Sequence, residues 1–500
     1  MPRDFDHDDV GWLKNPDEYL YGLNQTIQNA HVNAVIDSVV AGLAADPRRK
    51  FTYVEMFFFE GWWAQQDEEV RATVRKLVAE KRLMFACGGW TMPDEAAPIY
   101  QEYLDIYTLG HRFIKEQVGG TVQTASQLDP FGHSATHAVL MRDAGMDAVF
   151  FARMSHTEYT WRRETKGRQF WWQPSKTRPN VKIFAEILPF LTYCTPSQVS
   201  WDLSDELGSC FRDSTCVDHQ FIVDNKNMAQ YNVPRYVDTA VQLAATLGNM
   251  TQGNDLLLMS GCDFQWSAGM WNFANNDKLI RALNKDGRIS ARYSTLHEYA
   301  QFKIKDTTAQ YPTRDGDIFP YDDSLDGHNW WSGYFTSRPA LKRYARTVSS
   351  LYTTSRQLRG LLGAAGHEFS KLARSLGIVS HHDAIAGTAK QHVAFWYAKA
   401  LSDGVDEDLA GLSAAAKTAW GVSGLGFCAR RNESECSATA GISGSGQQVV
   451  MVWNSDGRSK STWVEVPVPS ASVKAVGPAV LQWQVHRTPL DVNQTNITSV

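Results

Sequence analysis

Lys50-Phe51-Thr52-Tyr53-Val54-Glu55-Met56-Phe57-Phe58 is an apolar run of the kind that forms a strand buried on both faces. A helical pattern follows from about Glu69 to Leu83, with four apolar side chains on one face: Val70, Val74, Leu77 and Val78. Apolar runs and amphipathic helices alternate in this way from residue 50 to about residue 300. The alternation predicts a parallel α/β domain, in which ligands bind at the carboxyl ends of the strands.

The length of the chain predicts more than one domain, because 500 residues exceed what one hydrophobic core usually organises. We expect the α/β domain over residues 1–320 and a helical bundle over residues 321–420, where Ala, Leu, Arg and Ser are frequent and Pro is rare. Residues 421–500 contain a Gly- and Ser-rich stretch and then strand-like runs. They predict the beginning of an all-β sandwich domain that is incomplete at residue 500.

The composition excludes several classes of protein. With 43% apolar and 12% aromatic residues, the chain is expected to fold around packed cores. The 49 basic and 54 acidic residues are interspersed, without a basic stripe that could follow a phosphate backbone, so nucleic acid is not an expected partner. No run of 18 apolar residues occurs, so no membrane span is expected. The sequence makes no prediction of oligomeric state.

Four short segments carry side chains suited to metal binding and to acid–base chemistry. They are His7-Asp8-Asp9-Val10-Gly11-Trp12, Leu128-Asp129-Pro130-Phe131-Gly132-His133, Gly261-Cys262-Asp263-Phe264 and His381-His382-Asp383-Ala384. Each segment alone is compatible with polar surface or a turn. Together they supply imidazoles and carboxylates, which zinc prefers, from several parts of the chain.

Asp129 and Asp263 each follow a strand-like stretch, which places both where an α/β domain carries its site. Arg153 follows a third such stretch and could supply a cation. His381 and His382 are neighbours in a helical context, so only one imidazole can point directly at a shared metal. The two aspartates form a candidate pair for glycoside hydrolysis: one attacks the sugar or activates water, and the other protonates the leaving oxygen.

Further motifs strengthen this interpretation. They are Tyr53-Val54-Glu55, Gly61-Trp62-Trp63, Gly88-Gly89-Trp90, Trp331-Ser332-Gly333-Tyr334-Phe335-Thr336-Ser337-Arg338-Pro339 and His381-His382-Asp383-Ala384-Ile385-Ala386-Gly387-Thr388. Taken jointly with the four segments, they resemble glycoside hydrolase family 38, the retaining α-mannosidases, and most closely its lysosomal acid branch. The likeness covers nearly the whole chain.

The resemblance implies a role for each candidate residue. One Zn²⁺ per chain would be bound by four side chains: His7, Asp9, Asp129 and His382. Asp129 would also be the nucleophile that forms a covalent mannosyl-enzyme, and Asp263 would be the general acid/base. Trp12 would stack on the mannose ring, while Arg153 and Asp383 would contact the surroundings of the nucleophile or the sugar hydroxyls.

The resemblance also implies the architecture and the disulfides. The family fold is an N-terminal parallel α/β domain, a helical bundle that contributes a zinc ligand, and C-terminal β domains. Cys428 with Cys436, and Cys210 with Cys216, would form disulfides. Sequons at Asn24, Asn249, Asn432, Asn493 and Asn496 agree with a lysosomal or other secretory location.

The N-terminal end departs from the family pattern. Phe5 stands where the family has a His, and only six residues precede His7, so we expect the first strand to be missing or abnormally short. The first residues also lack the apolar stretch of a signal peptide. We therefore expect the natural beginning of the protein to lie upstream of Met1, and its C-terminal β domains to continue beyond residue 500.

Three functions compete on this evidence. The first is a zinc-dependent retaining α-mannosidase that acts on terminal α-D-mannosyl residues of N-glycan oligosaccharides. The second is an inactive mannose-binding remnant of such an enzyme, motivated by the expected loss of the first strand and the expected truncation of the β domains. The third is a zinc amide hydrolase in which His7, Asp9 and His382 hold a metal with its bound water and Asp129 acts as the base.

Overall fold

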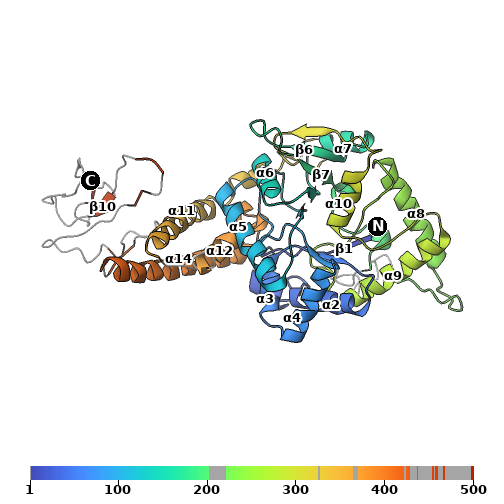
Figure 1. Ribbon diagram of the computed structural model, residues 1–500, viewed down its shortest axis with the longest axis horizontal. Helices are drawn as coiled ribbons and strands as arrows, with labels where there is room; N and C mark the ends of the chain where they lie inside the picture. The colour runs from blue at the N-terminus through green and yellow to red at the C-terminus, as the bar shows by residue number, and fades with distance from the viewer. Residues whose placement is uncertain are drawn as a thin grey trace. The chain divides into compact units, whose positions relative to one another are not determined.

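The computed structural model of the chain describes residues 2–201, 221–324, 327–363 and 370–421, with short pieces between 424 and 499 (Figure 1). The chain divides into two compact units. One comprises Met1–Arg346 with Ala373–Leu401, and the other comprises Thr347–Leu372 with Ser402–Val500. Every predicted site residue belongs to the first unit.

The first unit contains a parallel four-stranded sheet with the strand order β3-β2-β1-β8. Its strands are β1 (Pro2–Phe5), β2 (Phe51–Tyr53), β3 (Leu83–Phe85) and β8 (Leu258–Ser260). Asp4 pairs with Phe51 on one side and with Ser260 on the other. We expected the first strand to be missing or abnormally short: it is present as the four-residue strand β1, which lies in the middle of the sheet, where both neighbours satisfy its backbone.

A second sheet in the same unit has five strands in the order β4-β5-β7-β6-β9. They are β4 (Thr124–Gln127), β5 (Ala148–Phe151), β6 (Gln169–Gln173), β7 (Ile183–Ile187) and β9 (Thr313–Asp315). β4, β5 and β7 are parallel, whereas β6 runs antiparallel to β7. The α/β class is confirmed, with one sheet mixed rather than purely parallel. The N–H of Cys87 donates to the carbonyl of Thr124 at 2.9 Å and links the two sheets.

Helices alternate with the strands of the first unit. They are α1 (Pro16–Leu20), α2 (Val32–Ala45), α3 (Met56–Trp63), α4 (Glu68–Ala79), α5 (Tyr100–Phe113), α6 (Ala135–Asp143), α7 (His156–Glu164), α8 (Val233–Asn249), α9 (Gly269–Asp286) and α10 (Leu296–Lys305). Short helical turns lie at η1 (Ile114–Val118), η2 (Pro189–Leu191), η3 (Ser197–Val199) and η4 (Gly333–Phe335). In Figure 1, α2, α3 and α4 gather beside the sheet that contains β1.

The predicted helical region follows, as α11 (Pro339–Leu361), α12 (Lys371–Val379), α13 (His382–Ala386) and α14 (Gln391–Trp420). The apolar run at 50–58 is not one strand, because it ends as β2 and then begins α3. Most of α3 is buried, including Met56, Phe58 and Phe59. A helix that is buried on most sides has no polar face, so its sequence cannot be told from a strand by periodicity alone.

Aromatic side chains form the core beneath the first sheet. Phe5 and Phe51 are fully buried, and the ring of Phe51 meets Trp266 edge-on with centroids 5.2 Å apart. Trp266 in turn contacts Phe273 of α9 at 4.8 Å. Each such burial stabilises the fold by about 1.5–3 kcal/mol, so β1 is anchored by its side chains as well as by hydrogen bonds.

The cysteines and the C-terminal residues differ in part from expectation. Cys194 and Cys262 form a disulfide that was not predicted. Cys436 is disulfide-bonded, but Cys428 lies outside the described residues, as do Cys210 and Cys216.

Within the expected β domain, β10 (Glu465–Pro467) pairs antiparallel with β11 (Ile497–Ser499), and most other residues there lie outside those described.

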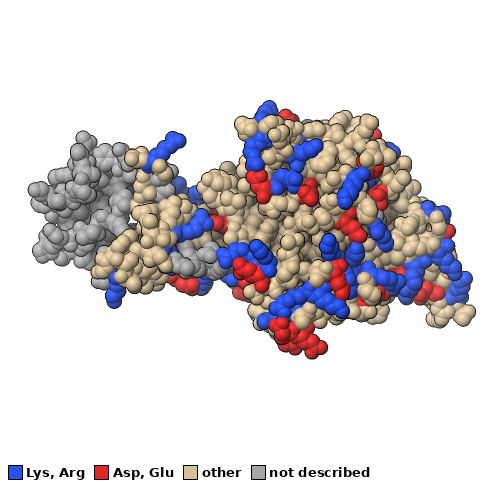
Figure 2. All heavy atoms as spheres, in the orientation of Figure 1, with Lys and Arg blue, Asp and Glu red and all other residues tan. Residues whose placement is uncertain are grey.

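The surface carries both signs of charge. Figure 2 shows Lys and Arg side chains interspersed with Asp and Glu side chains over the face in view. Among the described residues, no helix is both long and apolar enough to cross a membrane.

Candidate active site

The predicted site residues lie where strands end. His7 and Asp9 come directly after β1, and Asp263 comes after β8 in the same sheet. Asp129 follows β4, and Arg153 follows β5 in the second sheet. His382 and Asp383 come instead from α13. The rule that α/β folds carry ligands at the carboxyl ends of strands therefore accounts for all but the helical residues.

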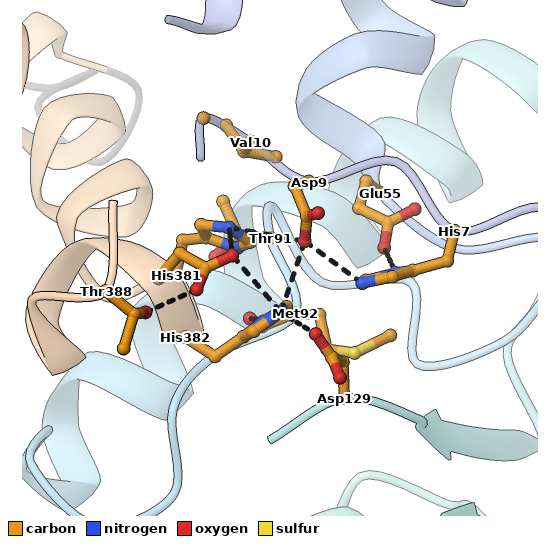
Figure 3. Close-up of polar contacts among 12 residues, drawn as sticks. His7, Asp9, Val10, Glu55, Thr91, Met92, Asp129, His381, His382 and Thr388 are labelled. Carbon is orange, nitrogen blue, oxygen red and sulfur yellow. Dashed lines mark hydrogen bonds and ion pairs between the residues drawn. The ribbon is translucent and has the colours of Figure 1, made fainter. Parts of the chain in front are cut away.

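Four of these side chains converge on one point (Figure 3). His7, Asp9, Asp129 and His382 each offer a ligand atom, and these atoms all lie within 4.8 Å of one another. Oδ1 of Asp9 is 3.1 Å from Nε2 of His7 and 3.2 Å from Nε2 of His382. Oδ2 of Asp129 lies 3.2 Å from the same nitrogen of His382. The four residues are all buried.

Both imidazoles are held by hydrogen bonds at Nδ1, the ring nitrogen that does not face the cluster. Nδ1 of His7 is 2.9 Å from Oε1 of Glu55, and Nδ1 of His382 is 2.9 Å from the carbonyl oxygen of Met92. Because a carboxylate and a carbonyl can only accept, each Nδ1 carries a hydrogen, and a neutral ring in this tautomer turns the lone pair on Nε2 toward the cluster. Nε2 of His7, Nε2 of His382 and Oδ1 of Asp9 are buried without a hydrogen-bond partner.

This donor set fits a metal ion. Two imidazoles and two carboxylates are ligands of the kind that bind zinc, and each histidine has the outer acceptor that metal-ligating histidines usually have. Burial alone would raise the pKa of Asp9, but the neighbouring imidazoles outweigh it and lower the pKa. Burial likewise lowers the pKa of His7, but the Asp9 carboxylate outweighs it and raises the pKa. The carboxylates thus favour positive charge at the centre of the cluster.

Asp129 belongs to two interactions at once. Its Oδ2 faces His382, while its Oδ1 accepts hydrogen bonds from the Arg153 guanidinium, with Nε at 2.5 Å. Burial acts to raise the pKa of Asp129, but the charge of Arg153 and the contacts with His382 lower it to about 2. Asp129 is therefore held as a carboxylate.

Three aromatic rings surround Arg153. The guanidinium carbon lies 5.7 Å from the Phe131 ring, 5.5 Å from the Tyr321 ring and 5.7 Å from the Trp331 ring. Arg153 also donates a hydrogen bond to the Tyr321 hydroxyl at 3.2 Å. We call Phe131, Tyr321 and Trp331 the arginine cage, because their three rings lie 5.5–5.7 Å from the guanidinium carbon of Arg153.

Asp263 lies beside His7. The two residues form an isolated parallel bridge, and the N–H of Phe264 donates to the His7 carbonyl at 2.9 Å. Tyr193, which follows β7, packs edge-on against the His7 ring with centroids 5.7 Å apart. Burial raises the pKa of Tyr193, and the carboxylates of Asp129 and Asp263 raise it further. The Tyr193 phenol therefore lies near both candidate carboxyl groups.

Trp12 lies in a turn next to the cluster and is partly exposed. Its carbonyl accepts a hydrogen bond from the N–H of Lys390 at 2.9 Å. The preceding Gly11 has φ +97°, and a Cβ there would lie 2.2 Å from the Tyr397 hydroxyl, so only glycine fits this turn. The backbone that carries Trp12 is therefore tightly packed.

His381, His382 and Asp383 lie at the start of α13. Only His382 joins the four-residue cluster with Asp129, but His381 and His382 both belong to a second group that could hold a metal ion, together with Asp9 and Asp383. Nε2 of His381 is 3.6 Å from Oδ1 of Asp9 and 3.7 Å from Oδ2 of Asp383. Asp383 also accepts a hydrogen bond from the Thr388 hydroxyl. The expectation that only one of the two imidazoles can face a shared metal is therefore not met by this second group.

Sequence reasoning gave no role to three residues that shape the site. Glu55 and Tyr193 each contact His7, a predicted site residue, and Glu95 contacts His133 at 2.9 Å. Glu55 and Tyr193 follow β2 and β7. The strand-end rule that found Asp129 did not point to Glu55, because residues 50–58 were expected to form one strand and Glu55 lies within that range. No sequence signal marked Tyr193 or Glu95.

Comparisons with known proteins agree with this architecture. Residues 4–324 match the glycosyl hydrolases family 38 N-terminal domain, and residues 329–418 match the alpha mannosidase middle domain. A probable alpha-mannosidase of Arabidopsis thaliana is 36% identical over 510 residues, covering 99% of this chain and 47% of that protein. The lysosomal alpha-mannosidase of Homo sapiens is 36% identical over 481 residues, covering 92% and 45%.

Solved structures share the fold at lower identity. The crystal structure of an alpha-mannosidase from Enterococcus faecalis V583 has a TM-score of 0.62 and 17% identity, covering 83% of this chain and 42% of that chain. The present chain spans about half the length of the curated relatives it matches. Because the family 38 N-terminal domain matches more than half of its residues, the chain belongs to glycosyl hydrolase family 38.

Proposed function

We propose that this chain carries the catalytic site of a zinc-dependent retaining α-mannosidase that hydrolyses terminal α-D-mannosyl residues of N-glycan oligosaccharides. The observation that carries the proposal is the convergence of His7, Asp9, Asp129 and His382, in which Asp129 is also paired with Arg153. The matched relatives are named as alpha-mannosidases, which supports the choice of sugar.

The metal site would be filled by Zn²⁺ held by the four converging side chains. When bound, zinc supplies an electrophilic centre that binds sugar hydroxyls and stabilises developing charge. Glu55 and Met92 hold the imidazoles in the tautomer that ligation requires.

Asp129 is the proposed nucleophile. Its contact with Arg153 keeps it ionised, so a carboxylate oxygen can attack the anomeric carbon as the bond to the leaving oxygen breaks. The product of this step is a mannosyl ester of Asp129. Asp263 is the proposed general acid/base: it gives its proton to the leaving oxygen and then takes one from the water that hydrolyses the ester.

Substrate positioning is assigned to residues around these carboxyl groups. The partly exposed Trp12 offers an aromatic face suited to the apolar side of a pyranose ring. Asp383, oriented by Thr388, can accept a hydrogen bond from a sugar hydroxyl. Arg153 is confined by the arginine cage and acts on Asp129.

The remnant and amide-hydrolase functions have less support. The remnant was motivated by a missing first strand and by truncated β domains, and the first of these reasons is removed because β1 is present and central. In an amide hydrolase Asp129 would serve as a base, whereas its lowered pKa of about 2 suits a nucleophile better.

We also propose a lysosomal or other secretory location. The Cys194–Cys262 disulfide and the exposed sequon residues Asn24 and Asn249 are typical of proteins that pass through an oxidising compartment. Two of the relatives cited carry alpha-mannosidase names, and the human one is lysosomal by name. Endoglycosidase treatment of the protein from its native host should lower its apparent mass, and Asn24→Gln with Asn249→Gln should reduce that shift.

Aryl α-D-mannoside hydrolysis tests the enzymatic function. The 500-residue chain should release the aryl group, and Asp129→Asn and Asp263→Asn should each lower turnover by at least about a hundredfold. Asp238→Asn is the matched control, because Asp238 is exposed and pairs only with Arg288 among the contacts described. Elemental analysis should find about one zinc per chain.

The outcomes separate the three functions. Mannoside binding by a folded, zinc-loaded protein that does not turn over would favour the remnant. Release of acetate from acetylated sugars, with glycosidic bonds left intact, would favour the amide hydrolase. Equal turnover by the Asp129→Asn variant and the parent chain would exclude the proposed nucleophile.

A further inference from the structure

The disulfide between Cys194 and Cys262 lies at the proposed acid/base residue. Cys262 directly precedes Asp263, and Cys194 directly follows Tyr193. One covalent bond therefore joins the segment that carries the phenol near the carboxyl groups to the segment that carries the proposed proton donor. The four proposed zinc ligands all lie on other segments.

The Asp263 backbone is held on its opposite side by β1. Gly261 has φ +153°, and a Cβ there would lie 1.9 Å from the Phe5 carbonyl oxygen. The N–H of His7 donates to Cys262 at 3.4 Å, and the N–H of Phe264 donates to His7 at 2.9 Å. Asp263 thus sits between β1 on one side and the disulfide-linked segment on the other.

Hydrogen bonds next to the disulfide join the same two segments. The N–H of Thr195 donates to the carbonyl of Gly261 at 2.8 Å, and the N–H of Gly261 donates to the Thr195 hydroxyl at 2.6 Å. These contacts align residues 194 and 195 with residues 261 and 262. The aligned backbone continues directly into Asp263.

The segment that reaches Cys194 contains two residues in an uncommon backbone conformation. Phe190 and Leu191 both have positive φ, at 65° and 53°, a conformation that side-chain-bearing residues keep only when the surroundings hold it. A cavity lies between this segment and β8, lined in part by Phe190, Cys194 and Met259. Packing against β8 is therefore incomplete, and a covalent tie replaces part of it.

We propose, on the basis of the mannosidase function proposed above, that the Cys194–Cys262 disulfide is a positioning element that holds Asp263 for proton transfer to the leaving oxygen. Cys194 and Cys262 are positioning residues, because neither thiol chemistry nor substrate contact is required of them. Cys194 is partly exposed, so a reductant can reach the bond. A phosphine would reduce it to two thiols, taking up one oxygen atom from water as the phosphine oxide.

The test compares two substrates that differ in their need for the acid. A 2,4-dinitrophenyl α-D-mannoside has a leaving group that departs without protonation, whereas an α-mannosyl-mannose disaccharide requires proton donation. The double variant Cys194→Ala/Cys262→Ala should lower kcat/KM for the disaccharide about tenfold or more and change kcat/KM for the dinitrophenyl substrate by less than about threefold, since general acid catalysis contributes about 10²–10⁴-fold. The comparison uses kcat/KM because this parameter reports the steps up to formation of the mannosyl ester, whereas both substrates share the later step in which Asp263 acts as a base. Zinc content should be unchanged.

Chemical reduction of the parent chain is a second way to remove the Cys194–Cys262 disulfide. Phosphine treatment of the folded parent chain should reproduce the selective loss, and reoxidation should restore it, while the double variant should not respond. Cys87→Ser is the control for the remaining described free thiol, which is buried beside Ser126. The Cys87→Ser variant should lose activity on phosphine treatment as the parent chain does. Because phosphine acts on a chain that has already folded, this experiment tests the disulfide even if the double variant folds poorly.

The outcomes are distinct. Equal losses on both substrates, or no loss on either, would overturn the positioning role while leaving the mannosidase function standing. A parent chain that hydrolyses neither mannoside would contradict the proposed function, and the positioning role would fall with it.

Discussion

Nδ1 of His7 lies 2.9 Å from Oε1 of Glu55, and both side chains are fully buried. Glu55 follows β2, the strand next to the one that leads to His7, so adjacent strands deliver a ligand and its orienting carboxylate together. The contact fixes the hydrogen on Nδ1 and aims Nε2 at Asp9.

Glu55→Ala is therefore expected to weaken zinc binding by about 10–100-fold, the usual effect of removing the outer partner of a ligating histidine. Glu55→Gln should lose less zinc affinity than Glu55→Ala, because the amide oxygen can still accept a hydrogen bond from Nδ1 of His7. Zinc affinity can be measured by competition with a chromogenic chelator. Glu60→Gln, on α3 and paired with Arg374, is the matched control and should bind zinc as the parent does. Parental zinc affinity in Glu55→Ala would contradict the orienting role.

Acid stability should depend on Glu95, which is buried between His133 and His137. Burial acts to raise its pKa, but the two histidines outweigh it and lower the pKa to about 2. A carboxyl whose pKa is lower in the folded state stabilises the fold above its unfolded pKa of about 4.3, and this contribution is lost as the pH falls toward 2. The loss between pH 6 and pH 3 is about 1.5–2 kcal/mol.

Glu95→Gln removes this titration. The decrease in unfolding free energy from pH 6 to pH 3 should therefore be about 1.5–2 kcal/mol smaller in the variant than in the parent, as measured by urea denaturation at each pH. Glu164→Gln is the control, because Glu164 is exposed and should leave the pH dependence as it is. If the unfolding free energy of Glu95→Gln depended on pH as that of the parent does, Glu95 would not be the source of the acid sensitivity.

Much of the site could be predicted because its residues follow recognisable strands. Asp129 and Asp263 come after apolar runs, and the carboxyl ends of parallel strands are where α/β folds carry their ligands, although the two residues follow strands of different sheets. Glu55 was not within reach of this rule, because residues 50–58 were expected to form one strand. Its partner His7 could not be assigned to a central strand, because four residues give too little pattern to be recognised and the neighbours that stabilise β1 come from residues 51–53 and 258–260.

Other features depend on contacts that no local pattern contains. The arginine cage joins Phe131 to Tyr321 and Trp331, which are 190 and 200 positions away, and the Cys194–Cys262 bond joins residues 68 positions apart. With seven cysteines many pairings are possible, and the family resemblance implied two short-range ones. The boundary between β2 and α3 was also hidden, because burial on most sides removes the polar face that marks a helix.

The arginine cage should affect the chemical step through Arg153. Trp331→Leu removes one ring 5.7 Å from the guanidinium, and a cation–π contact contributes about 0.5–2 kcal/mol, so kcat/KM should fall by about 2- to 30-fold. The fall should lie mainly in kcat, because Arg153 acts on Asp129. Trp330→Leu is the adjacent control and should change kcat/KM little, since Trp330 is 47% exposed. A change confined to KM would instead indicate a substrate contact for Trp331.

Phe5→Ala tests whether the short central strand holds the first sheet together. The Phe5 side chain is fully buried at the end of β1, and truncation of a buried Phe costs about 3–5 kcal/mol. We expect a loss of this size in urea denaturation followed by tryptophan fluorescence, to which the buried Trp266 of the same core contributes. Phe395→Ala on α14 is the control: Phe395 is 66% exposed, so its loss should stay within about 0.5 kcal/mol. Equal stability of the two variants would mean that β1 contributes no packing to the core, and His7 and Asp9 would then lack the anchored strand that their positions at the metal cluster require.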